Sequence, residues 1–447
     1  MKKQLFLICL CFFSFSLFAQ LEFSGEVTAE GYYSTGDKLP FWMYHNKRGR
    51  ISENTNVAGW ITGKAVYSFG AASSLEVGAG VLYQDGIGNN IFLDEAYIQY
   101  KNDWLQIIGG RKQKEELYNG LSATNENILW SLNARPLPGI QFRTNRPVMV
   151  FPEAGIGFEA SLEEYVMEKN RHVSHARVHH KRFHLVYQPD EEWRIRAGIQ
   201  HFAQWGGVSQ TTGQQPVGFT DYLKVFTGIA GGENAVDGDQ VNVLGNHLGS
   251  YELYIKKSFP DWSLEIIYNH IFEDGSGSRY ANFPDGRYGL FFDFENEKSL
   301  VNSFIYEIYY TKNQSVYSPQ KNDAYFNNYL TYRSGWTYHQ RVLGAPFFKY
   351  DPVENRIENN SFLVHHIGIS GSFGDFFTRY PYKLLVSYAR NNGTIEKIYY
   401  PAQDVMYWSF ELQLLQNFVD LSLQLSGNYD SYMSPVYGAG VSLKKKF

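Results

Sequence analysis

The chain has 447 residues and a formal net charge of −5, with 40 Lys and Arg against 45 Asp and Glu. This mildly acidic balance argues against a nucleic-acid partner, which a broad basic bias would serve. The mean hydropathy is −0.35, and no stretch after Ala19 approaches the length of about 18 apolar residues that a membrane-spanning helix needs. Aromatic residues nevertheless reach 17%, as expected for a membrane barrel with belts of Tyr and Trp at both interfaces.

Residues 1–19 are predicted to be a secretory signal peptide. Two lysines precede an apolar run, and cleavage is expected after Ala19. Both cysteines of the chain, Cys9 and Cys11, lie in this segment. We therefore expect residues 20–447 to form one mature domain without a disulfide, a thiol nucleophile or a thiolate metal site.

Segments in which apolar and polar side chains alternate recur along the whole chain. This period of two places the apolar side chains on one face of a strand. About 18 segments fit, each near the length that crosses a bilayer at a tilt. The clearer ones are residues 22–33, 57–69, 75–84, 92–100, 104–111, 156–166, 176–187, 193–202, 248–257, 263–272, 300–310, 362–373, 382–390, 405–414, 419–429 and 436–447, and the weaker ones are 139–145 and 287–294.

The connections alternate between short turns and long loops. The long ones are residues 34–56, 112–138, 203–245 and 311–361. Short periplasmic turns and long outer loops are typical of bacterial membrane barrels, in which an even strand number leaves both termini in the periplasm. The pattern therefore predicts an all-β, transmembrane antiparallel β-barrel of about 18 strands. A soluble β-sandwich or β-propeller remains the alternative.

The last residue, Phe447, lies on the apolar face of the final predicted strand. A terminal aromatic in this position looks like the tail of outer-membrane barrel proteins, where it acts as an assembly signal. We therefore expect the protein to lie in the cell outer membrane, in contact with its lipid. Barrel assembly machinery that reads Phe447 is the expected partner for insertion, and the barrel is expected to be a monomer.

One outer loop is predicted to contain a short helix. Within residues 219–229, apolar side chains recur at helical spacing, with Thr220 and Asp221 as an N-cap pair and Gly231 as part of a stop signal. An amphipathic helix must bury its apolar face, and we expect it to do so in the barrel mouth. Such a plug would favour binding over conduction.

Neither a metal site, a cofactor nor an active site is predicted. The histidines between His172 and His184 are interpreted as lumen-lining polar residues, because positions four apart on a strand are about 13 Å apart. Calcium at Asp237 and Asp239 is a weaker alternative. No nucleophile elbow, H-E-x-x-H, P-loop or Rossmann pattern occurs. We therefore expect no enzymatic activity.

Motifs in the long loops resemble those of a known family. They are residues 40–50 (PFWMYHNKRGR), 130–136 (WSLNARP), 221–224 (DYLK) and 332–338 (YRSGWTY). In order and content they are similar to the capsule assembly protein Wzi family, in its Bacteroidetes-type branch. The resemblance implies a lectin-like outer-membrane barrel that attaches capsular or extracellular polysaccharide to the cell surface. Enterobacterial members carry extra helical structure, whereas here the first predicted strand starts just after Gln20.

Aromatic and polar side chains in these loops are candidates for glycan binding. Flat aromatic faces stack on sugar rings, and Asn, Arg and His can bond hydroxyls and uronate carboxylates. The alternative is that they pack the loops into the barrel mouth, and for Arg135 that it forms a loop-locking ion pair. A porin or solute channel and an outer-membrane enzyme are the competing functions. The candidates are Trp42, Tyr44, His45, Arg48, Trp130, Asn133, Arg135, Trp336 and Tyr338.

Overall fold

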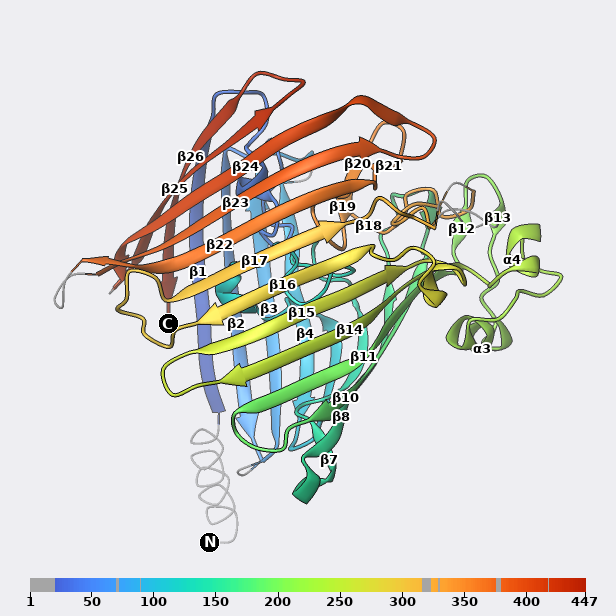
Figure 1. The fold of residues 1–447 in the computed structure, drawn as a ribbon, viewed down its shortest axis with the longest axis horizontal. Helices are drawn as coiled ribbons and strands as arrows, with labels where there is room; N and C mark the ends of the chain where they lie inside the picture. The colour runs from blue at the N-terminus through green and yellow to red at the C-terminus, as the bar shows by residue number, and fades with distance from the viewer. Residues whose placement is uncertain are drawn as a thin grey trace, which may run out of the picture.

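The computed structural model describes residues 21–69, 72–88, 90–315, 323–328, 330–374, 379–416 and 418–447. The predicted signal peptide lies outside these residues. The chain rolls one antiparallel sheet into a closed barrel (Figure 1). None of the described helices is long and apolar enough to cross a membrane.

The barrel wall contains nineteen strands, which occupy eighteen strand positions around the barrel. β6 and β7 run in the same direction and pair with successive parts of β8, so together they fill one place. This confirms the predicted strand number, including the two weaker segments. The strands are β1 (Leu21–Ser34), β2 (Val57–Ser68), β3 (Ser74–Gln84), β4 (Ile91–Lys101), β5 (Leu105–Arg111), β6 (Gly139–Thr144), β7 (Val148–Phe151), β8 (Ile156–Val166), β10 (Arg177–Tyr187), β11 (Trp193–Trp205), β14 (Asn246–Ser258), β15 (Ser263–Phe272), β16 (Gly286–Asp293), β17 (Ser303–Tyr310), β22 (Phe362–Gly374), β23 (Arg379–Gly393), β24 (Ile398–Gln416), β25 (Asp420–Asp430) and β26 (Val436–Lys446).

The first and last strands close the ring. β1 pairs with both β2 and β26, and in the second pair Glu26 lies opposite Lys446. The start of β1 and the end of β26 therefore lie at the same end of the barrel, where the short turns are, and we call this the periplasmic end. The long loops lie at the opposite, outer end.

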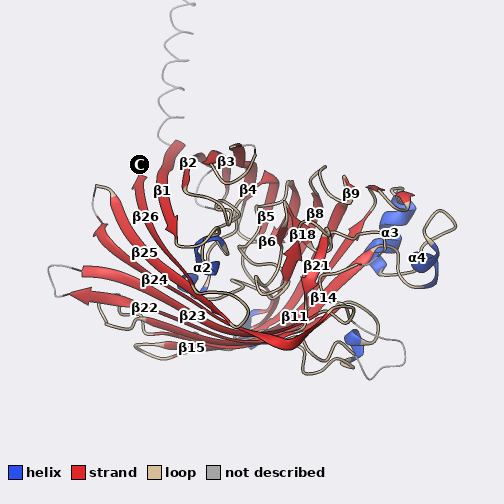
Figure 2. Cartoon of the chain, turned by 90° about the horizontal axis from the view of Figure 1, so that it is seen from above, coloured by secondary structure: helices blue, strands red, loops and turns tan. Residues whose placement is uncertain are grey.

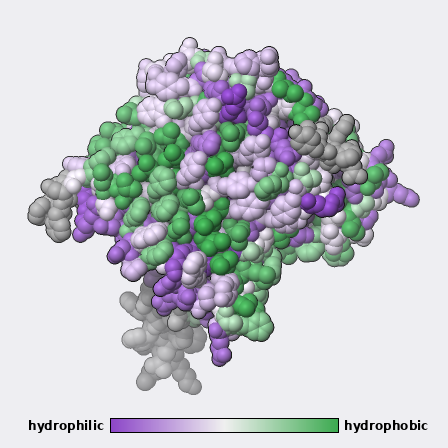
Figure 3. Space-filling model, viewed as in Figure 1, coloured by the Kyte–Doolittle hydropathy of each residue, from purple (hydrophilic) through white to green (hydrophobic). Residues whose placement is uncertain are grey.

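Alternation along the strands separates an apolar outer surface from a polar lumen. On β25, Leu423 and Leu425 are exposed on the outside, whereas Gln424 and Ser426 are buried on the inside. Hydrophobic residues gather in patches across the outside of the wall (Figure 3). This arrangement suits a wall that faces lipid, because side chains of opposite polarity point to opposite faces of each strand.

Three outer loops fold into the lumen and fill it (Figure 2). We call them together the plug. They are residues 35–56 with α2 (Phe41–Tyr44), residues 112–138 with the 3-10 turn η1 (Tyr118–Gly120), and residues 323–328 and 330–361 with the hairpins β18 (Thr337–Tyr338) to β19 (Arg341–Val342) and β20 (Lys349–Asp351) to β21 (Arg356–Asn359). Their apolar side chains share one large buried cluster with lumen-facing residues of the wall.

The predicted loop helix exists, but its predicted place was wrong. Helix α3 (Phe219–Thr227) lies outside the wall, in a lobe with α4 (Asp237–Val241) at the right of Figure 1. Its buried Val225 packs against Ala203 and Trp205, which face outward from β11. The N-cap is also different from the prediction, because the carboxylate of Asp221 accepts the backbone N–H of Gly218 at 3.0 Å.

The histidine interpretation was correct for only part of the set. His180 and His184 face the lumen, where they contact Trp130 and Glu252. His179 points outward, because it lies one position away on the same strand, and it is buried under α3 against Phe226. A strand with polar residues at successive positions must place some of them on its lipid side.

Candidate functional site

All nine candidate residues lie in the plug, and the structure brings them together inside the barrel. Six are buried: Trp42, Trp130, Asn133, Arg135, Trp336 and Tyr338. The other three, Tyr44, His45 and Arg48, are half-buried. Their contacts with one another and with the wall decide which of them a polymer can reach.

The first plug loop is held by aromatic stacking around α2. The ring of Phe41 lies 3.9 Å from that of His45 and 4.0 Å from that of Tyr407 on β24. Trp42 meets Phe347 edge-on, with ring centroids 6.1 Å apart. Burial lowers the pKa of His45 well below its ordinary value. His45 is therefore neutral at pH 7 and does not offer a positive charge to an acidic sugar.

The basic end of the same loop is tied to its neighbours. The guanidinium of Arg48 donates to the carbonyl of Lys114, and its backbone N–H donates to Leu132 at 2.8 Å. Arg50 forms a two-pronged ion pair with Asp94 on β4, with Nη2 at 2.6 Å and Nε at 3.1 Å from Oδ2. No spacing in the sequence marks this pair. Such geometry fixes the orientation of both groups.

The second loop packs against the wall through Trp130 and against its neighbours through Arg135. Trp130 meets Phe202 edge-on at 5.3 Å. The guanidinium of Arg135 lies 3.8 Å from the ring centroid of Phe92, and its Nε donates to the carbonyl of Gly49 at 3.4 Å. Burial lowers the pKa of Arg135 to about 10. Within the described part of the chain, stacking rather than an ion pair locks this arginine.

Asn133 links the second loop to the third. Its Nδ2 donates to the carbonyl of Val342 at 2.9 Å. Beside it, the hydroxyl of Ser131 donates to the carbonyl of Gly344 at 2.7 Å. These contacts join segments more than 200 residues apart in sequence. They therefore make the plug one body.

The third loop carries the β18–β19 hairpin, whose turn reaches solvent. Its two-residue turn, His339 and Gln340, is exposed, with φ angles of 47° and 62°. Beneath it, Arg111 donates to the hydroxyl of Tyr338 at 2.9 Å. Trp336, on the same loop, is almost fully buried. The hairpin thus presents polar turn residues outward on an aromatic base.

Arg171, which was not among the predicted site residues, holds this hairpin in place. Its guanidinium donates to the carbonyls of Thr337 at 2.8 Å and Gly335 at 3.1 Å. It also pairs with Glu168 at 3.2 Å. The outer loop between β8 and β10 therefore contributes to the site, although nothing in its sequence distinguishes Arg171 from the neighbouring Lys169.

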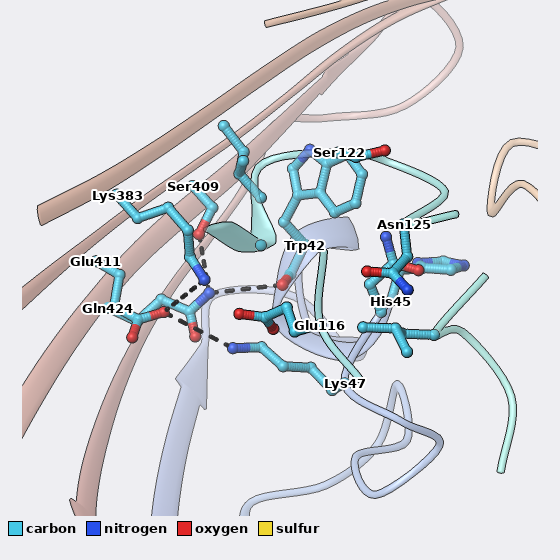
Figure 4. Close-up of a pocket in the computed structure, with 14 residues that line it drawn as sticks. Trp42, His45, Lys47, Glu116, Ser122, Asn125, Lys383, Ser409, Glu411 and Gln424 are labelled. Atoms are coloured by element: carbon cyan, nitrogen blue, oxygen red, sulfur yellow. Dashed lines mark hydrogen bonds and ion pairs between the residues drawn. The ribbon is translucent and has the colours of Figure 1, made fainter. Parts of the chain in front are cut away.

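A cavity of about 80 Å³ lies between the plug and β23–β25 (Figure 4). It is lined by Trp42 and His45, and by charged residues that include Lys383 and Glu411, whose Nζ and Oε2 are 4.0 Å apart. Typical small-molecule pockets measure roughly 300–1,000 Å³. The cavity is therefore too small for a sugar chain. Among the described residues, no group of three or more His, Cys, Asp or Glu side chains could hold a metal ion.

Comparison with known proteins identifies related chains. The family described as "Capsule assembly protein Wzi" matches residues 35–349. Among solved structures, the chain is similar to Wzi, an outer membrane protein involved in group 1 capsule assembly in Escherichia coli, with 13% identity over 95% of this chain and 84% of that one and a TM-score of 0.63. It is also similar to OccAB2 of Acinetobacter baumannii, with 10% identity over 95% of this chain and 98% of that one and a TM-score of 0.49. None of the curated protein sequences matches the chain.

Proposed function

The chain belongs to the capsule assembly protein Wzi family, and from this premise we propose that it is a non-enzymatic lectin of the outer membrane that attaches capsular or extracellular polysaccharide to the cell surface. The filled lumen carries this proposal. All nine candidate residues lie in loops that close the barrel. A polymer can therefore be held at the outer face, and the plug, as far as the structure describes it, leaves no open path through the lumen.

Within this function we propose a division of work among the candidates. The buried side chains, such as Trp42 and Trp336, hold the plug in shape. The half-buried Tyr44, with the guanidinium of Arg341 4.6 Å from its ring centroid, and the exposed His339–Gln340 turn offer contacts to sugar. A guanidinium can bind a uronate carboxylate bidentately. His45, which bonds to the carbonyl of Phe41, and Arg48, which donates to the carbonyl of Lys114, support the loop that carries Tyr44.

The cellular test is removal of the protein from a capsulated strain. We expect polymer synthesis to continue while polymer is shed into the medium. The measurement is the ratio of cell-bound to released polysaccharide. Unchanged cell-bound polymer would show that attachment does not depend on this protein.

The molecular test is capture of the host polymer by purified protein. We expect Gln340→Ala and Arg341→Ala to weaken capture while leaving the fold intact. Trp42→Ala and Arg135→Ala should also weaken capture, but only because they make the plug less stable. Val353→Ala, in the exposed turn between β20 and β21, is the matched control that should bind normally.

We further propose how the protein matures. Cleavage after Ala19 would release residues 20–447 as a monomeric barrel, and assembly machinery would read Phe447. Phe447 supports this by facing outward at the periplasmic end, where its ring is exposed. The loop motifs at residues 40–50, 130–136, 221–224 and 332–338 support placement in the Bacteroidetes-type branch of the family.

A further inference from the structure

The outer ends of β8, β10, β11 and β14 carry an unusual group of polar residues on the lipid side of the wall. These five residues, which we call the outer-wall cluster, are Glu164, His179, Lys181, His201 and His247. Phe183, two positions after Lys181 on β10, is exposed and belongs to the apolar belt. Polar groups at this boundary need partners, because hydrocarbon offers none.

Much of the cluster is paired within itself or with α3, although Nε2 of His179 and Nδ1 of His201 are buried without a hydrogen-bond partner among the described residues. Nδ1 of His179 lies 2.6 Å from Oε1 of Glu164, and Nε2 of His201 lies 2.8 Å from Nδ1 of His247. The ammonium of Lys181 donates to the carbonyl of Phe226 at the end of α3. The helix therefore lies flat on the outer wall and covers polar residues there.

The remaining surface of α3 is divided into an apolar and a polar side. Phe219 and Leu223 are 77% and 47% exposed, and at about 100° per residue they point within about 40° of each other. Thr220 and Thr227 are exposed on the adjacent polar side, next to the half-buried Lys224. A short helix with one face on protein, one apolar face and one polar face matches the boundary between lipid and water.

The height of α3 along the wall agrees with that boundary. On β11, Trp193 marks the periplasmic side, and His201 in the outer-wall cluster lies eight residues further on. At the usual rise and a tilt near 40°, His201 is roughly 20 Å and Trp205 about 30 Å above Trp193, whereas the apolar band of such barrels is about 25 Å tall. The helix thus lies at the outer edge of this band. In Figure 1 it forms the lower side of its lobe, below α4.

We propose that α3 is an interfacial helix that inserts Phe219 and Leu223 into the outer leaflet and so extends the lipid-contacting surface of the barrel sideways. Lipid is the occupant that fits, because the exposed apolar side continues the belt formed below it by Phe183 and Ile199. The helix shields the outer-wall cluster from acyl chains and fixes the height of the barrel in the membrane.

The test measures the surroundings of single spin labels in proteoliposomes. Both natural cysteines lie in the predicted signal peptide, so an introduced cysteine is unique in the processed barrel. Leu223→Cys and Phe219→Cys report on the apolar side, and Thr220→Cys is the matched control on the polar side of the same helix. Leu185→Cys in the belt and Val353→Cys at a loop tip give the lipid and water references, since both positions are exposed.

The protein is reconstituted in phosphatidylcholine–phosphatidylglycerol vesicles, and collision with oxygen is compared with collision with a water-soluble nickel chelate. We expect the oxygen-to-nickel ratio at positions 219 and 223 to approach that at 185 and to exceed that at 353 several-fold, with position 220 nearer to 353. Ratios at 219 and 223 equal to that at 353 would place the helix in water. Low collision with both reagents together with spin–spin broadening would mean that a second copy covers it. Either result would overturn the proposal.

Discussion

The ring of Phe447 lies directly against Gly25 on the first strand. The two residues exchange backbone hydrogen bonds of 2.8 and 3.0 Å. A Cβ on Gly25 would come within 2.5 Å of the Cζ of Phe447, so the ring occupies the space that a larger residue would need. The last residue of the chain thereby completes the join between β1 and β26.

Replacing Phe447 with Ala is expected to lower the yield of assembled barrel several-fold, because the final contact at the closing join is lost together with the terminal aromatic. The measurement is the fraction of protein in the outer membrane that shifts in electrophoretic mobility on heating. Phe151→Ala removes another exposed phenylalanine, on β7 and outside the join, and it should assemble normally. Equal yields for the two variants would argue against a special role for the last residue.

The ion pair between Arg287 and Glu307 should be the most sensitive polar contact in the lumen. Nη2 and Oε1 are 2.6 Å apart and both side chains are fully buried. Glu307 also accepts the N–H of Ala123 at 2.9 Å, which ties the second plug loop to β17. Glu307→Leu leaves the guanidinium unpaired, and we expect it to lower the free energy of unfolding by about 3–5 kcal/mol.

Urea unfolding in detergent micelles measures this loss. The control is Glu396→Leu, which breaks the exposed pair with Arg356 at 3.3 Å. Exposed pairs contribute roughly 0–1 kcal/mol. A loss at Glu307 no larger than that at Glu396 would contradict the assignment of the buried pair as an anchor of the plug.

The strands could be predicted because the polarity of each side chain indicates whether its position faces the lipid or the lumen. Alternation gave the bounds of β8 as residues 156–166, and the structure has Ile156–Val166. The weak segment 139–145 corresponds to β6, after which the strand place is interrupted and continues as β7. Helix α3 was also readable from its spacing. The position of this helix could not be predicted, because an amphipathic pattern indicates that one face is buried but does not indicate the surface against which it packs.

The sequence predicted which loops form the candidate site, but it did not predict which residues in them contact one another. The aromatic and basic composition of residues 40–50 and 130–136 predicted both glycan contact and packing, and the two require the same residue types. Arg50 with Asp94, and Arg171 with the carbonyl of Thr337, join positions far apart in the chain. Local spacing contains no information on such partners, so only the folded arrangement reveals them.

Protonation of Asp285 should make the outer-loop packing more stable in mild acid. Burial raises the pKa of Asp285 to about 6, above a value of about 3.9 in an unfolded chain. Between about pH 4 and pH 6 the folded state therefore binds more protons, and the free energy of unfolding falls as pH rises through this window, by about 3 kcal/mol at most. Burial also raises the pKa of Asp323 to about 6, which adds in the same direction.

The measurement is urea unfolding at pH 4.5 and pH 7. Asp285→Asn should reduce the difference between the two conditions, because the side chain no longer ionises, while Asp323 keeps part of it. Asp237→Asn, at an exposed position on α4, should leave the difference unchanged. A difference that Asp285→Asn changes no more than Asp237→Asn does would contradict this prediction. The wild-type difference alone cannot test it, because the lowered pKa of Glu126, about 2, acts in the opposite sense.

The plug should keep the barrel from conducting. Three loops fill the lumen with a continuous buried cluster, so we expect no open-channel steps when the purified protein is inserted into a planar bilayer. Replacing residues 113–137 with a short Gly-Ser linker removes Trp130, Arg135 and the contacts of Glu307, and we expect it to produce ohmic steps. Removing residues 230–243 from the lobe outside the wall is the control, because it deletes outer-loop mass without opening the lumen. Large steady conductance of the unmodified protein would instead support a solute channel, since a lumen closed by packed side chains cannot pass ions at that rate.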